Sequence, residues 1–134
     1  MKIEVVGWAS PTKNLEPLPD DAFVVRGGQN LPINFAKASG VAVDEGEKLQ
    51  NVSVNCAPDL SVEELTAPNP QTGYPGIPHN HVGVTTVGAI RAAGGDVVLS
   101  PTRTNPNHAT LSGLTPDEAS QLFRPTIKNP GKRN

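Results

Sequence analysis

The three histidines of this chain are its best candidates for acid–base chemistry, because imidazole titrates near neutral pH. His108 begins the segment His108-Ala109-Thr110-Leu111-Ser112, in which polar and apolar residues alternate. In a β-strand this alternation places His108, Thr110 and Ser112 on one face and the two apolar side chains on the other. An imidazole beside two hydroxyls can hydrogen-bond a phosphate or a sugar hydroxyl, although an ordinary solvent-facing strand shows the same pattern. The segment is the first candidate for a site.

Further candidate groups lie in two other segments. His79 and His81 belong to residues 67–83, a stretch with four prolines and three glycines. Such a stretch predicts a long loop of the kind that often carries function. Arg26 ends an apolar run and precedes two glycines. Glycines let the backbone pass close to a ligand, and a guanidinium can clamp an anion through two N–H groups. A hairpin turn with a surface arginine is the alternative interpretation.

The histidines do not predict a metal site. His79 and His81 with His108 offer three imidazoles to zinc, but a single His-x-His lacks specificity and no cysteine pair supports it. Cys56 follows alternating valines, so a buried structural thiol is a better interpretation than a nucleophile. The chain has no P-loop, no Gly-x-Gly-x-x-Gly and no His-Glu-x-x-His motif. We therefore expect neither a metal nor an organic cofactor.

Length and composition indicate one small domain, residues 1–134. A chain of 134 residues can bury a core without disulfides, and its one cysteine excludes an internal disulfide. No apolar run is long enough for a membrane span, and the N-terminus is typical of a strand rather than a secretory signal. We therefore expect a cytoplasmic protein with no membrane partner. Residues 1–64 have 5 Lys/Arg against 10 Asp/Glu, whereas residues 65–134 have 6 against 3. An anionic ligand is thus expected to meet the C-terminal half, although chance explains such a split equally well.

The order of elements predicts an α+β fold, with a small, mostly antiparallel sheet, short helices and long Pro- and Gly-rich loops. Apolar or alternating runs predict the strands Lys2–Val6, Ala22–Arg26, Asn51–Cys56, Asp96–Ser100 and His108–Ser112. Capping residues predict helices from about Pro32 to Ala38, after Ser61, from Thr85 or Thr86 through Ala93, and from Pro116 to before Pro125. The last helix is the best defined, because Thr115 and Glu118 can form a capping box around a proline at the first helical position.

These side chains predict a metal-independent ribonuclease. Cleavage of RNA through its own 2′-hydroxyl needs a base, an acid and donors around the phosphorane. His108 would be the acid or the base, and His81 or His79 would supply the other role. Arg26 or Arg103 would steady the phosphate. The predicted catalytic set is His108, His81, Arg26 and Thr110, and the predicted substrate-binding set is Ser112, Arg103 and His79.

The chain length, the strand and helix over residues 84–124 and this set of His, Arg, Thr and Ser side chains resemble small bacterial toxin ribonucleases of the barnase, EndoU, colicin and RelE kind. The resemblance implies RNA as the substrate, acid–base chemistry without a metal, and a protein antidote as partner. The chain departs from these enzymes in its net charge of −2, because they are commonly basic.

Other classes of function remain open. Val24-Val25-Arg26-Gly27-Gly28 resembles the strand-borne arginine that opens ADP-ribosyltransferase domains. Those NAD-processing domains also have a late catalytic glutamate, whereas the last glutamate here, Glu118, is already explained by a helix cap. His108-Ala109-Thr110-Leu111 fits the His-x-Thr/Ser motif of two-histidine phosphoesterases once, but His81-Val82-Gly83-Val84 has glycine where the hydroxyl belongs. A non-catalytic binding or inhibitor module that uses the acidic N-terminal half is a further alternative.

Overall fold

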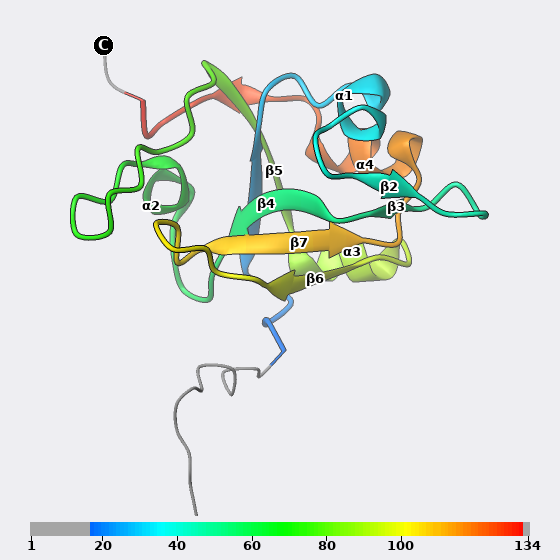
Figure 1. Ribbon diagram of the computed structural model, residues 1–134, viewed down its shortest axis with the longest axis horizontal. Coiled ribbons are helices and arrows are strands. Elements are labelled where there is room, and N and C mark those ends of the chain that lie inside the picture. The colour runs from blue at the N-terminus through cyan, green and yellow to red at the C-terminus, as the bar shows by residue number, and fades with distance from the viewer. Residues whose placement is uncertain (1–16, 133–134) are drawn as a thin grey trace, which may run out of the picture.

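A single antiparallel sheet organises the structure, a computed structural model that describes residues 17–132. Its six strands run in the order β6-β7-β4-β1-β5-β8 (Figure 1). Their bounds are β1 Phe23–Gly27, β4 Val52–Cys56, β5 His81–Thr86, β6 Asp96–Leu99, β7 His108–Ser112 and β8 Ile127–Lys128. A separate hairpin pairs β2, Ala42–Val43, with β3, Leu49–Gln50. The predicted strand Lys2–Val6 lies outside the described residues.

Within residues 17–132, four short helices connect the strands: α1 Pro32–Ala36, α2 Val62–Thr66, α3 Val87–Ala92 and α4 Pro116–Phe123. Their starts follow the predicted caps. The side chains of Ser61, Thr86 and Thr115 each accept a hydrogen bond from a backbone amide of the first turn. Within the described residues, no helix is long and apolar enough to cross a membrane. The predicted α+β fold with a mostly antiparallel sheet is confirmed.

The two faces of the sheet differ. One face carries the main core, in which Val24, Val54 and Leu111 of the strands pack with Phe35 of α1 and Phe123 of α4. Helices α1, α3 and α4 seal this face. The opposite face has a smaller apolar cluster of four buried residues, Val25, Ala57, Leu65 and Val82. It is covered at one end by α2 and by residues 67–80, which we call the proline-rich loop (Figure 1). The remainder of that face is free of helices.

The proline-rich loop is shorter than the sequence predicted. We expected a loop through Gly83, but β5 begins at His81 and lies between β1 and β8 in the sheet. Its Val82 and Val84 share one face with Val25, which is the alternation of a strand. Gly83 obscured this pattern. The glycine is needed because a Cβ there would collide with Phe123 of α4.

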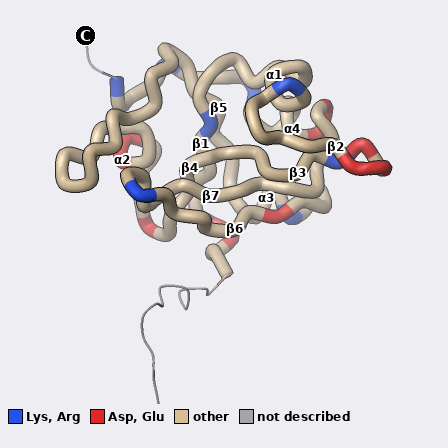
Figure 2. Tube along the Cα trace, viewed as in Figure 1, with Lys and Arg blue, Asp and Glu red and all other residues tan. Residues whose placement is uncertain are grey.

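The acidic and basic halves of the sequence are not separate halves of the molecule. Strand β1 pairs with β5, and β4 pairs with β7, so each sequence half contributes to the centre of the sheet. Figure 2 shows basic and acidic residues interspersed, with a group of acidic residues at the turn between β2 and β3. The charge split along the sequence therefore says little about where an anion would bind.

Candidate functional site

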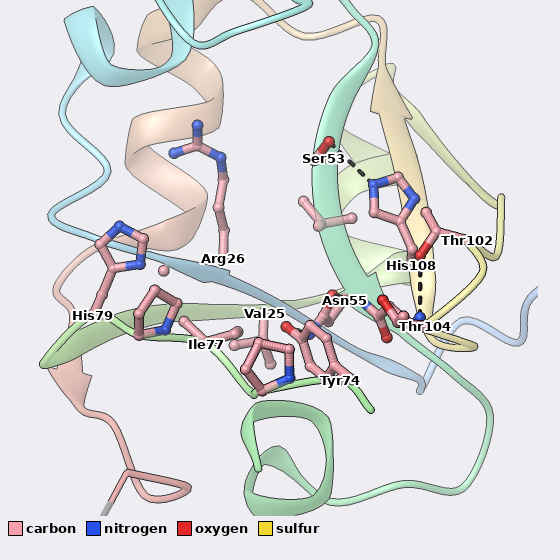
Figure 3. A pocket seen from close by; sticks show the side chains of 15 residues that line it. Val25, Arg26, Ser53, Asn55, Tyr74, Ile77, His79, Thr102, Thr104 and His108 are labelled. Carbon is pink, nitrogen blue, oxygen red and sulfur yellow. Dashed lines mark hydrogen bonds between the residues drawn. The ribbon is translucent and has the colours of Figure 1, made fainter. Parts of the chain in front are cut away.

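A cavity of about 450 Å³ opens on the face of the sheet that the three helices leave free, and it extends to Arg26 where β1 no longer pairs with β4. Strands β1, β4 and β7 form its floor. The proline-rich loop and residues 100–107, the loop between β6 and β7, form its walls. Figure 3 shows His79 and Arg26 on one side and Ser53 and His108 on the other. The lining residues are Val25, Arg26, Gly27, Ser53, Val54, Asn55, Tyr74, Pro75, Ile77, Pro78, His79, Thr102, Thr104, Asn105 and His108.

His108 has a defined orientation and tautomer. Its Nδ1 lies 2.9 Å from the carbonyl oxygen of Ser100 and 3.0 Å from the hydroxyl of the same residue. Because a carbonyl can only accept, the neutral ring must carry its hydrogen on Nδ1. Its Nε2 then holds a lone pair, which accepts a hydrogen bond from the Ser53 hydroxyl at 3.1 Å (Figure 3). The Ser100 carbonyl thus orients the His108 ring, and the Nε2 of that ring faces the exposed hydroxyl of Ser53 in the cavity.

The predicted polar row of β7 exists, but only one of its members lines the cavity. Ala109 and Leu111 are fully buried in the core, so His108, Thr110 and Ser112 share the other face as predicted. Thr110 lies opposite Ser53 in the ladder, and its Oγ1 is 2.7 Å from the Ser100 hydroxyl. Thr110 therefore supports the residue that orients His108. Ser112 lies at the far end of the strand, opposite Asp96, and does not line the cavity.

On the other side of the cavity, His79 lies over Gly27. A Cβ at position 27 would collide with the imidazole of His79 and with the side chain of Ile77. The missing side chain therefore lets the proline-rich loop place His79 against the sheet. The buried Asn129 holds this loop from behind, because its amide donates to the carbonyls of Ile77 at 2.9 Å and His79 at 2.8 Å.

Arg26 is fixed by its neighbours but not neutralised by them. Its guanidinium stacks on the Phe35 ring at 4.4 Å and donates to the side-chain oxygen of Asn30 at 2.9 Å. It also reaches the carbonyl of Asn34 at 3.4 Å. Among residues 17–132 no carboxylate pairs with it, because the ion pairs found there are those of Arg91. Burial lowers the pKa of Arg26 from its usual range, yet an arginine stays charged at neutral pH.

Two buried asparagines join the floor of the cavity to both walls. The Asn55 amide nitrogen donates to the carbonyl of Leu65 at 2.8 Å and to the hydroxyl of Tyr74 at 3.0 Å. Its oxygen accepts from the Asn105 amide at 2.9 Å. Asn105 in turn accepts from the backbone amide of Asn107 at 3.1 Å. One side chain of β4 thus holds α2, the proline-rich loop and the 100–107 loop together.

Not every predicted site residue reaches the cavity. His81 is exposed on β5 opposite Lys128 and does not line it. Arg103 is exposed between Thr102 and Thr104, both of which line the cavity while Arg103 does not. The three histidines therefore do not gather around one point, and residues 17–132 contain no group of three potential metal ligands.

Glu118 is committed to the end of a helix. Its Oε1 accepts from the backbone amide of Thr115 at 2.9 Å, and this hydrogen bond is the main reason that the pKa of Glu118 lies below its usual range. It does not line the cavity that contains Arg26. The strand-borne arginine and the late glutamate are therefore not brought together.

Sequence reasoning missed several residues of the cavity. Ser53, Asn55, Tyr74, Thr102, Thr104 and Asn105 were not singled out. The alternation of β4 contained a signal, because Ser53 and Asn55 must share the face opposite the two valines. No pattern in the sequence around Tyr74 or Asn105 indicates that both side chains hydrogen-bond to Asn55.

The cavity is lined by basic side chains and by no acidic ones. Arg26, His79 and His108 line it, and none of its fifteen lining residues is an aspartate or a glutamate. Serine, threonine and tyrosine hydroxyls add neutral donors. Such a cavity suits an anionic ligand whose proton can be taken by the Nε2 of His108. Comparison with protein-family models, with curated proteins and with solved structures gave no match for this chain.

Proposed function

We propose that the protein is a metal-independent ribonuclease that cleaves RNA through the 2′-hydroxyl. The observation that carries the proposal is the oriented base, the Nε2 of His108, in a cavity that is lined by one arginine and by no carboxylate. RNA combines the two features that such a cavity suits. Its phosphate is an anion, and the adjacent 2′-hydroxyl supplies a proton for a base to remove.

In the proposed reaction the 2′-hydroxyl takes the place of the Ser53 hydroxyl as donor to the Nε2 of His108. The 2′-oxygen attacks phosphorus while its proton passes to His108, and the bond from phosphorus to the 5′-oxygen breaks. His79, on the opposite side of the cavity, protonates the departing oxygen. Arg26 stabilises the phosphorane charge. The products are a 2′,3′-cyclic phosphate and a 5′-hydroxyl.

The test is cleavage of a defined single-stranded RNA in the presence of EDTA. His108→Ala is expected to lower the rate by about a hundred- to ten-thousandfold, the usual contribution of one acid–base group. His81→Ala is the matched control, because this histidine is exposed and lies outside the cavity. A substrate with 2′-deoxyribose at the cleavage position should stay intact. Loss of activity with EDTA, cleavage of the deoxy substrate or an active His108→Ala would each refute the proposal.

A toxin role is part of this proposal. A ribonuclease with this site would be harmful to the cell that makes it, so expression of the wild-type chain should arrest growth while His108→Ala should not. An antidote is proposed to act by covering the cavity. Equal growth with both chains would contradict the toxin role without excluding RNA cleavage in vitro.

A serine hydrolase is a second candidate, favoured by the Ser53–His108–Ser100 arrangement. An exposed hydroxyl lies 3.1 Å from a basic nitrogen, and the base is oriented by a third group at 2.9 Å, which is the arrangement of an activated nucleophile. In this mechanism the Ser53 oxygen attacks an ester carbonyl, His108 accepts the proton and then delivers it to the leaving alcohol, and water hydrolyses the acyl-enzyme.

Ser53→Ala separates the two candidates. The ribonuclease should keep most of its activity in this variant, because the 2′-hydroxyl displaces Ser53, whereas a serine hydrolase should lose all of it. A fluorophosphonate probe adds a second measurement. Stoichiometric labelling of the wild type that is lost in both Ser53→Ala and His108→Ala would favour the hydrolase, and no labelling would exclude it.

A further inference from the structure

The sheet is split beside the cavity, between the central strands β1 and β4. Strand β1 pairs with β5 along its whole length, and β4 pairs with β7 at four successive positions. Between β1 and β4, however, the ladder ends at Val25 and Asn55. If the pairing continued in the same register, Gly27 would lie opposite Ser53. Both of these residues line the cavity instead.

The main chain of Gly27 points into this split. In an antiparallel sheet, the N–H and C=O groups of successive residues point alternately to the strand on one side and to the strand on the other. The amide of Gly28 donates to the His81 carbonyl at 2.9 Å and therefore points toward β5. The N–H and C=O of Gly27, one residue earlier, must point the other way, toward β4.

The main chain of Ser53 points into the split from the opposite side. The amide of Cys56 donates to the Asn107 carbonyl at 2.9 Å, which is on the side of β7. By the same alternation the N–H and C=O of Ser53, three positions earlier, point toward β1. The N–H groups of Gly27 and Ser53 therefore face one another across the split, and neither belongs to the ladder between the two strands.

Ser53 also connects the split with the base of the proposed reaction. Its hydroxyl lies 3.1 Å from the Nε2 of His108, while its own N–H faces the split. In the proposed reaction the 2′-oxygen takes the place of this hydroxyl and attacks phosphorus. The non-bridging oxygens on that phosphorus become more negative in the phosphorane, and they lie beside the attacking oxygen. Figure 3 shows Arg26 and Ser53 on opposite sides of the space into which these oxygens would extend.

We infer that the split is an oxyanion site, in which the amides of Gly27 and Ser53 donate to the non-bridging oxygens of the phosphorane. Donors of this kind are effective because the strands already hold them in place before the charge develops. Arg26 supplies positive charge at the same split, and the amides supply direction. The carbonyls of the same two residues are left for water. The inference rests on the proposed function in taking RNA as the substrate.

Replacing one amide with an ester tests the donor without changing any side chain. Glycolic acid at position 27 differs from Gly27 only in having an oxygen in place of the N–H. Glycolic acid at Gly40 is the matched control, because this glycine is exposed and does not line the cavity. The rate of RNA cleavage should fall by about a hundred- to a thousandfold with the ester at Gly27, which is the usual effect of removing one oxyanion donor. The ester at Gly40 should leave the rate unchanged.

A titration with inorganic phosphate is a second measurement, and it needs neither catalysis nor an altered chain. Amide proton shifts of the isotope-labelled full chain are followed by nuclear magnetic resonance. The amide protons of Gly27 and Ser53 should move downfield and saturate together, because a hydrogen bond to an anion deshields the proton. The amide proton of Gly40 should not move.

The outcomes separate this inference from the ribonuclease proposal. Where RNA is cleaved, the rate decides: a loss confined to the ester at Gly27 supports the oxyanion site, and equal rates with both esters overturn it while the ribonuclease stands. Where no RNA is cleaved, or where the ester at Gly27 does not fold, the titration decides. Saturable shifts of both amides without cleavage support an anion site at the split and refute the ribonuclease. Neither shifts nor cleavage overturns both.

Discussion

Replacing Asn55 with alanine should destabilise the fold by about 2–6 kcal/mol, although the residue belongs to the site rather than to the apolar core. Asn55 is almost completely buried and makes three hydrogen bonds through one amide group. Alanine removes all three bonds but leaves their partners in place. The cost therefore depends on whether each partner can find water.

Two of the three partners cannot. The Leu65 carbonyl belongs to a residue that is 1% exposed, and Asn105 is 6% exposed. A buried polar group left without a partner costs about 1–3 kcal/mol. The Tyr74 hydroxyl lies in a half-buried residue at the cavity, so water can replace its lost donor. Two such groups give about 2–6 kcal/mol, which is a large part of the total stability of about 5–15 kcal/mol expected for a domain.

Urea unfolding followed by far-ultraviolet circular dichroism measures the loss. Gln121→Ala is the control, because it removes an exposed amide from α4 and should change stability by less than about 0.5 kcal/mol. A double-mutant cycle with Asn105→Ala should give a coupling free energy of about 1 kcal/mol or more, since the two amides bond directly. A loss of unfolding free energy below about 0.5 kcal/mol for Asn55→Ala, or additive effects in the cycle, would show that the hydrogen bonds of Asn55 do not stabilise the fold as argued.

Three further substitutions or reactions test other parts of the structure. Gly27→Ala should displace the His79 ring, because the new Cβ occupies its place; a changed chemical shift of that imidazole and slower RNA cleavage are expected, and an unchanged shift would contradict the packing. Thr115→Ala should lower the free energy of unfolding in urea by about 1 kcal/mol, because the amide of Glu118 loses its cap, and no change would show that the cap is not formed. Burial raises the pKa of the Cys56 thiol to about 11, so Ellman's reagent at pH 8 should react with it only in urea. Stability should fall as the pH rises from about 8.5 toward that value, because the unfolded chain releases the thiol proton first, and rapid labelling of the native protein would contradict this burial.

The elements that the sequence predicted well are those with local causes. The alternation in β7 places Ala109 and Leu111 in the core, and no distant residue is needed to infer it. Thr115 and Glu118 cap α4 through groups three residues apart. Signals of this kind depend on backbone geometry within one turn or one strand, so they do not depend on where the helix or strand packs in the fold.

The elements that were missed depend on distant partners. Strand β5 contains Gly83 because α4 approaches the backbone there, and this approach cannot be inferred from residues near position 83. Asn55 and Asn105 are fifty positions apart and meet only because β4 pairs with β7. The sequence showed that Ser53 faces away from the core, but not that His108 lies on the neighbouring strand. Pairing order in an antiparallel sheet is a property of the whole chain, so it decides the site without leaving a local signal.

The two faces of the sheet are stabilised by different means, and this difference bears on function. Apolar packing seals the helical face, whereas buried asparagines hold the segments around the cavity: Asn30 beside Arg26, Asn55 and Asn105 at the floor, and Asn129 behind His79. An amide donates and accepts at once, so Asn30 can bond two backbone carbonyls and Arg26 together. An aspartate in its place would lose both donated bonds and would neutralise the arginine. Amides therefore let the chain build ordered walls around Arg26, His79 and His108 without placing a carboxylate among them.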